Sequence, residues 1–185
     1  MKKLIGKFFI KLMGWKIDPS LPTEIHRCVL VMGPHTSNWD YFIGMMAFWG
    51  IYHIDLKQLI KSELFFPPLG WILKGMGGIP VYRKSKNNMT STIAKMYGET
   101  NKLTITFTPE GTRAYNPKWK KGFYYIALEA KVPILLGYLD YSTKTGGVLK
   151  EVFYPTGNVE KDIEYIKSFY SNIKGKQPEN GIYTK

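Results

Sequence analysis

The sequence predicts an α/β domain in which a mostly parallel mixed sheet is flanked by helices. Apolar runs such as CVLVMG and LTITF have the length and composition of buried strands. Segments of helical length, including YFIGMMAFWGIYHI and KGFYYIALEA, lie between such runs. Strands that alternate with helices are typical of a parallel sheet with helices on its faces.

The elements follow one another without an internal repeat, and 185 residues with 44% hydrophobic content fit a single domain. We expect further strands at KQLIKS, IPVYR, PILLGYLDY and VLKEVFYP, and helices over 90–99 and 158–174. The predicted organisation is an amphipathic helix over 1–17, the main domain over 24–175 and a frayed tail over 176–185.

The N-terminal stretch MKKLIGKFFIKLMGWK predicts a basic amphipathic helix, with apolar residues at helical spacing and lysines on another face. It is too short and too charged to span a bilayer. We favour a helix that lies in the membrane interface. Its contacts would be Lys3, Lys7, Phe8, Phe9, Lys11 and Trp15. The alternative is a helix packed on the domain with its lysines solvated.

Charge narrows the range of partners. The 26 Lys and Arg against 14 Asp and Glu leave a formal net charge of +12, which attracts polyanions. Charge alone does not choose among nucleic acid, anionic lipid headgroups and an acidic protein. Nearly all of the positive charge is lysine, and Arg27, Arg83 and Arg113 are the only arginines. Arg suits forked recognition of phosphate better than Lys does, so the positions of these three arginines are more informative than those of the lysines.

Cysteine and histidine usage gives no support for a disulfide or a metal site. Cys28 is the only cysteine, so no intramolecular disulfide can form, and its apolar surroundings favour a core residue over a nucleophile. The three histidines are scattered, and no Cys/His cluster has zinc spacing. We expect no bound metal.

The stretch HTSNWD is the first candidate site. His35 follows a predicted buried strand and Pro34, at a strand-to-helix turn where α/β proteins tend to place their sites. A histidine there can accept a proton from a hydroxyl while Asp40 fixes its tautomer. Ser37 to Asp40 is equally an S-x-x-D capping box, in which Asp40 closes a helix N-terminus. The two interpretations are compatible.

The second candidate is the turn TPEGTR after the strand LTITF. Gly111 permits close approach of the backbone to a ligand, and Arg113 offers a forked donor for phosphate. An ordinary surface turn explains the Pro and Gly equally well. Arg83, at the end of GGIPVYR, could converge on the same phosphate, although a lone arginine is more often a solvated charge.

Together these segments resemble the lysophosphatidic acid acyltransferase (1-acylglycerol-3-phosphate O-acyltransferase) family. HTSNWD fits its H-x4-D signature, GGIPVYR resembles its second block, FTPEGTR is nearly its F-P-E-G-T-R block, and KVPILL resembles its fourth. The four occur in the family's order and cover roughly residues 28–140. H-x4-D alone is a weak signal, and its combination with EGTR downstream is a strong one.

The resemblance implies an acyltransferase that moves a fatty acyl group from acyl-CoA or acyl-carrier protein to the free hydroxyl of a lysophospholipid such as 1-acylglycerol-3-phosphate. His35 would be the general base and Asp40 would orient it. The glycerol phosphate would be bound by Arg83, Glu110, Gly111, Thr112 and Arg113. No cofactor beyond the acyl thioester is implied. The expected place is the cytoplasmic face of the cell membrane, as a peripheral or monotopic protein.

Two alternatives remain open. A relative of the same superfamily could acylate another lipid hydroxyl, such as that of an aminolipid or a lipid A precursor. A non-catalytic protein could bind anionic membranes or nucleic acid through its lysines, but that gives no reason for His35, Asp40 and EGTR to occur together. We therefore do not expect nucleic acid as a partner.

Overall fold

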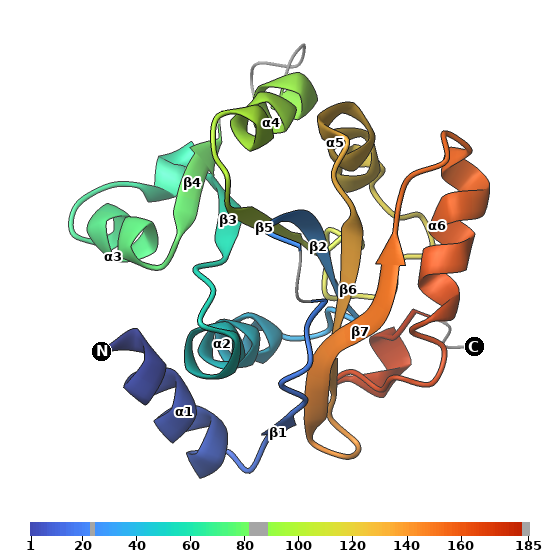
Figure 1. The fold of residues 1–185 in the computed structure, drawn as a ribbon. Helices are drawn as coiled ribbons and strands as arrows, with labels where there is room; N and C mark the ends of the chain where they lie inside the picture. Colours follow the sequence, from blue (N-terminus) through green and yellow to red (C-terminus); the bar gives the residue numbers. More distant parts are fainter. Residues whose placement is uncertain (23–24, 82–88, 183–185) are drawn as a thin grey trace.

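The computed structural model describes residues 1–22, 25–81 and 89–182, and its centre is a seven-stranded sheet (Figure 1). The strand order is β1-β7-β6-β2-β5-β3-β4, and every neighbouring pair is parallel except β6 with β7. The strands are β1 (Lys16–Ile17), β2 (Arg27–Gly33), β3 (Lys57–Lys61), β4 (Gly78–Val81), β5 (Leu103–Phe107), β6 (Ile134–Asp140) and β7 (Thr145–Phe153). The predicted α/β class with a mostly parallel mixed sheet is confirmed.

Helices cover both faces of the sheet (Figure 1). They are α1 (Lys2–Leu12), α2 (Asn38–Ala47), α3 (Leu69–Gly75), α4 (Met89–Gly98), α5 (Gly122–Ala130) and α6 (Val159–Ser168). A π-helical turn, Phe48–Tyr52, extends α2, and 3-10 turns occupy Ser62–Leu64 and Pro178–Asn180. No helix in the described residues is long and apolar enough to cross a bilayer.

The central strand β2 supplies apolar side chains to both layers. Val29 and Val31 pack with α4, α5 and α6 in the largest core cluster. Cys28 and Leu30 point the other way, into the cluster formed with the extension of α2. This alternation follows from the two-residue period of a strand that is buried on both faces. Cys28 is a buried core residue, as the sequence predicts.

Helix α1 packs on the domain and also leaves apolar side chains outside it. Gly6 meets Gly50 so closely that a Cβ on Gly6 would lie 2.5 Å from the Gly50 nitrogen, so only glycine permits this crossing. Ile10 is buried beside them, whereas Leu4, Phe8 and Leu12 remain exposed. The two interpretations of this segment are therefore not exclusive: one stripe of the helix packs inward and another faces outward.

Three details of the sequence prediction are wrong. Trp15 is only 7% exposed and packs edge-on against Tyr141, so it is not a surface contact. The predicted helix over 158–174 ends at Ser168, because Tyr170 turns into the core and donates to the Val31 carbonyl at 3.1 Å. The segment 176–182 is not frayed: the backbone N–H of Gln177 donates to Thr36 Oγ1 at 3.1 Å, and Ile182 packs on the main core.

Candidate active site

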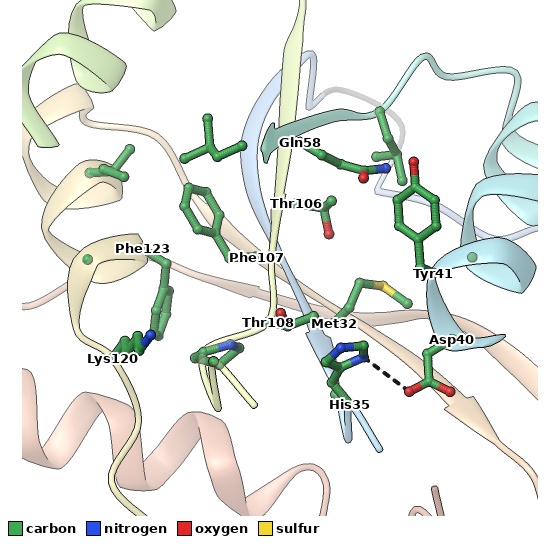
Figure 2. Close-up of a pocket in the computed structure, with 18 of the residues that line it drawn as sticks. Met32, His35, Asp40, Tyr41, Gln58, Thr106, Phe107, Thr108, Lys120 and Phe123 are labelled. Carbon is green, nitrogen blue, oxygen red and sulfur yellow. Dashed lines mark hydrogen bonds and ion pairs between the residues drawn. The ribbon is translucent and has the colours of Figure 1, made fainter. Parts of the chain in front are cut away.

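The turn between β2 and α2 brings His35 and Asp40 together. His35 follows the buried end of β2, and Asp40 is the third residue of α2. Their side chains meet at 3.1 Å, from Nδ1 of His35 to Oδ2 of Asp40 (Figure 2). Ser37 forms the predicted capping box with Asp40. The capping and pairing interpretations of this motif are both correct, because one carboxylate closes the helix and faces the histidine.

The Asp40 carboxylate is held from several directions. Its Oδ2 atom also accepts the backbone N–H groups of Thr36 and Ser37, each at 2.8 Å. Its Oδ1 atom accepts the Tyr141 hydroxyl at 2.7 Å. Burial, together with the carboxylate of Asp40, raises the pKa of Tyr141, so the phenol remains a donor. With Nδ1 of His35 donating to Asp40, Nε2 of the neutral ring is left as an acceptor toward the cavity.

Glu110 is buried and accepts a hydrogen bond from the His35 backbone, whereas the sequence predicted that it binds the glycerol phosphate. Its side chain is only 5% exposed and does not line the cavity. Oε1 accepts the backbone N–H of His35 at 3.0 Å, whereas Oε2 has no hydrogen-bond partner among the described residues. Burial raises the pKa of Glu110. Glu110 therefore does not lie at the cavity with the other described residues that were predicted to bind the glycerol phosphate.

The loop after β5 places two cations at the cavity. Gly111 adopts a φ of +65°, and a Cβ there would lie 2.5 Å from Cε of Lys120. Glycine thus lets the Lys120 side chain cross the loop closely. Arg113 donates from Nη1 to the Asn38 side chain at 2.8 Å. We call Arg113 and Lys120, which both line the cavity, the cationic rim.

A cavity of about 1030 Å³ joins these groups. His35 and Asp40 line it together with the cationic rim, and Gly111 and Thr112 contribute to its wall. Most of its remaining wall is apolar, including Met32, Met45, Leu59, Phe107 and Phe123. The arrangement combines a proton acceptor, fixed positive charge and room for hydrocarbon, which suits an amphipathic anionic substrate.

The structure brings together most of the predicted site residues. His35, Asp40, Gly111, Thr112 and Arg113 line one cavity. Arg83 lies outside the described residues. Within those residues no group of three or more His, Cys, Asp and Glu side chains could hold a metal ion.

The sequence prediction missed Tyr141, Lys120 and Asn38. Tyr141 lies 101 residues from Asp40, and no local pattern links them. Lys120 lies in a chain with many lysines, where one more carries little information. Asn38 lies within HTSNWD, three residues after His35, and only this position in the motif indicated that it belongs to the site.

Fold and site together define an α/β protein in which a histidine–aspartate pair faces a cavity with cationic and apolar walls. The chain belongs to the acyltransferase family, whose sequence model matches residues 19–135.

Sequence similarity to two individual proteins supports this assignment. The chain is 30% identical over 161 residues to human 1-acyl-sn-glycerol-3-phosphate acyltransferase beta, covering 83% of this chain and 55% of that protein. It is 27% identical over 128 residues to an uncharacterized acyltransferase of Schizosaccharomyces pombe, covering 65% of this chain and 45% of the other. It thus spans about half the length of these curated relatives.

A solved structure shares the fold. The 1-acyl-sn-glycerophosphate (LPA) acyltransferase PlsC from Thermotoga maritima superposes with a TM-score of 0.63 at 19% identity. The match covers 91% of this chain and 74% of that one. It confirms the arrangement of the sheet and helices.

Proposed function

We propose that the protein transfers a fatty acyl group from an acyl thioester to the free hydroxyl of a lysophospholipid, with 1-acylglycerol-3-phosphate as the acceptor. The observation that carries the proposal is the His35–Asp40 pair, joined at 3.1 Å, in one cavity with the cationic rim. The donor is acyl-CoA or acyl-carrier protein, both of which are anionic and complement a net charge of +12.

His35 acts as the general base. Its Nε2 atom takes the proton of the acceptor hydroxyl as the oxygen attacks the thioester carbonyl. Asp40 keeps the proton on Nδ1 in the resting state and stabilises the imidazolium once Nε2 is protonated. The C–S bond then breaks, and the imidazolium returns its proton to the leaving thiolate. Acyl transfer is direct, and no acyl-enzyme forms.

The cationic rim binds the phosphate of the acceptor. Arg113 presents a planar fork of donors and Lys120 a compact positive charge. The hydrogen bond from Arg113 to Asn38, at 2.8 Å, holds the guanidinium beside the turn that carries His35. A phosphate at this position leaves the acceptor hydroxyl near His35 and the hydrocarbon toward the apolar wall.

The variant His35→Ala tests the proposal. Removing the base should lower kcat by about a thousandfold, since general base catalysis contributes roughly 10²–10⁴. The measurement is transfer of a labelled acyl group to 1-acylglycerol-3-phosphate in detergent micelles. His53→Ala, which alters an exposed histidine outside the cavity, is the matched control. Equal transfer by the wild type and His35→Ala would refute the assignment.

We further propose that α1 and the segment around α3 contact the membrane. Phe8 on α1 is 62% exposed and Trp71 on α3 is 70% exposed. Other apolar side chains accompany them: Leu4, Leu12, Leu64, Phe66 and Ile72 are also exposed. Both helices lie on the side away from α6, with β4 beside α3 (Figure 1). Exposed apolar groups among lysines are suited to an anionic bilayer surface.

Liposome sedimentation tests this surface. Phe8→Ser and Trp71→Ser should each weaken binding to anionic vesicles severalfold, and the pair should weaken it more. Tyr165→Ser alters an exposed aromatic on α6 and should leave binding unchanged. Equal binding by all three variants would place the membrane contact elsewhere.

A further inference from the structure

The cavity passes through a split in the sheet. β3 pairs with β5 only at Lys57–Ile105 and Gln58–Thr106, whereas β3 continues along β4 to Lys61. β5 in turn continues along β2 to Phe107. The two strands therefore part beyond Gln58 and Thr106. Residues from both layers line the cavity, so it reaches both faces of the sheet.

Each face contributes an apolar lobe. The lobe toward α4 and α5 is lined by Ile93, Phe107, Phe123 and Ile126, all from or against the main core cluster. The lobe toward α2 is lined by Met32, Met45 and Leu139 from the cluster beneath α1, with Leu56 beside them. Such walls suit hydrocarbon chains.

Three polar side chains interrupt the lobe toward α2. Gln58 is only 8% exposed, and its register partner Thr106 lies beside it on the same face of the sheet. Tyr41 reaches them from α2, with its hydroxyl turned toward the Gln58 amide (Figure 2). The Thr106 hydroxyl is buried and has no hydrogen-bond partner among the described residues.

An unpartnered hydroxyl on the wall of an apolar cavity has a cost. A buried polar group without a hydrogen bond destabilises the folded state, because it has lost its bonds to water. Valine has nearly the shape of threonine and would avoid that cost. A hydrogen bond from a ligand group to Thr106 would satisfy the hydroxyl. Gln58 and Tyr41 add donors and acceptors around the same space.

We propose that Tyr41, Gln58 and Thr106 form a subsite for a hydroxyl group carried on a substrate acyl chain. This inference rests on the proposed acyl transfer and specifies a class of substrate for it. The hydroxyl belongs either to the acyl chain of the thioester donor or to that of the lysophospholipid acceptor.

Charge excludes the headgroup phosphate from this subsite. The charged or titratable side chains that line the described part of the cavity, apart from Tyr41, are His35, Asp40, Arg113 and Lys120. The first two belong to the turn between β2 and α2, and the last two form the cationic rim. Tyr41, Gln58 and Thr106 are uncharged. An uncharged hydroxyl can use this amide and these two hydroxyls fully, whereas an anion would lack a counterion here.

The experiment compares paired substrates in two arms. In one arm the donor carries a hydroxyl at successive carbons of the acyl chain and the acceptor is plain; in the other arm the acceptor chain is hydroxylated and the donor is plain. We expect kcat/KM to favour the hydroxylated substrate about tenfold at one chain position in one arm, as expected for a site that pairs a substrate hydroxyl.

The variants Thr106→Val and Gln58→Leu should abolish that preference. Thr104→Val is the matched control, because Thr104 lies on the same strand and face, contacts Cys28 and does not line the cavity. It should retain the preference. Equal use of plain and hydroxylated chains by the wild type, or a preference unchanged in both subsite variants, would overturn the inference.

A binding measurement separates this inference from the proposed function. A hydroxylated fatty acid should raise the Tm of the wild type more than the plain fatty acid does, and Thr106→Val should remove the difference. That result without any acyl transfer would refute the proposed function and support the subsite. Transfer with no hydroxyl preference in either measurement would refute the subsite and leave the proposed function intact.

Discussion

The histidine turn, residues 33–40, and the cationic rim face the same cavity but are held in opposite ways. In the turn, Asp40 accepts from His35, Thr36, Ser37 and Tyr141, and its exposure is 8%. The rim lies on an open loop, where Arg113 is exposed and donates to Asn38. One region is fixed on every side, and the other retains freedom to adjust.

This difference matches the two tasks that the regions would perform. Proton transfer requires that the reacting atoms are placed to within a few tenths of an ångström of their reactive positions. Each hydrogen bond that holds Asp40 therefore contributes to the rate. Binding a phosphate tolerates movement, since charge attraction is long-ranged and the side chains can follow the ligand. Changes in the turn should therefore lower kcat, and changes in the rim should raise KM for the acceptor.

Asp40→Asn should produce the largest effect. The amide oxygen can still accept from the backbone N–H groups of the turn while the amide nitrogen faces Tyr141, so the turn should keep its shape. Loss of the negative charge should lower kcat by about 10²–10⁴, because the imidazolium loses its counterion. Steady-state kinetics gives kcat, and thermal unfolding verifies the fold. A change confined to KM would contradict the distinction between turn and rim.

Arg113→Ala should have the next largest effect. Removing a charge-assisted contact to phosphate should raise KM for 1-acylglycerol-3-phosphate by about tenfold or more, with kcat within about threefold of wild type. Arg113→Lys should recover only part of the loss, since lysine lacks the planar fork.

Two controls accompany the Arg113→Ala measurement: an acceptor without phosphate and a variant of a lysine outside the cavity. Monoacylglycerol, which lacks the phosphate, should be a poor acceptor for the wild type and no worse for Arg113→Ala. Lys118→Ala removes a positive charge from the same loop at a position that does not line the cavity. It should leave KM unchanged. If the wild type uses both acceptors equally, the acceptor is another lipid hydroxyl and the rim does not bind phosphate.

Tyr141→Phe should have a smaller effect on the turn. It removes the 2.7 Å hydrogen bond to Oδ1 of Asp40 and leaves the other three in place. We expect kcat to fall by about threefold to tenfold, within the range of one hydrogen bond to a charged group. Steady-state kinetics measures this fall in kcat.

Tyr52→Phe is the matched control for that variant. Tyr52 also donates one hydrogen bond, to the Asp18 carbonyl, and lies outside the cavity. Its removal should leave kcat unchanged. An equal fall in kcat in both variants, or in neither, would show that Tyr141 only packs against Trp15 and does not position Asp40.

The sequence predicted those features that local residues determine. The strands β2 and β5 follow from apolar runs, and the capping box follows from Ser37 and Asp40 at fixed spacing. His35 and Asp40 were found for the same reason, since five residues across one turn suffice to bring them together. The parallel pairing of all neighbouring strands except β6 and β7 agrees with the alternation of strand and helix.

What the sequence did not predict depends on distant contacts. Trp15 follows a basic amphipathic helix, which suggested a membrane contact, but packing against Tyr141 buries its side chain. Glu110 belongs to a motif associated with binding, yet it faces the backbone of His35 from a buried position. The short strand β1 exists because Lys16 and Ile17 pair with the start of β7, about 130 residues away (16 to 145). Register between such segments is set by the fold and leaves little local pattern.

Glu110→Gln should have the smallest effect, and it concerns stability. Burial raises the pKa of Glu110 above its ordinary 4.5, so the folded state binds the proton more tightly than the unfolded state does. The free energy of unfolding therefore falls as pH rises from below 4.5 through the folded pKa, and the full cost persists above it. Glutamine can keep an oxygen on the His35 amide and does not titrate.

The variant should accordingly gain stability relative to the wild type as pH rises, by about 1.4 kcal/mol for each unit by which the pKa is raised. Denaturant unfolding of both proteins between acidic and neutral pH gives this difference. Asp162 has a pKa lowered by its hydrogen bonds with Tyr124 and Thr156, which outweigh its burial, and it contributes the opposite trend. Because Asp162 is present in both proteins, its contribution cancels in the difference. A difference that stays constant with pH would mean that Glu110 is ionised without cost, and that the back of the histidine turn is as well solvated as the rim.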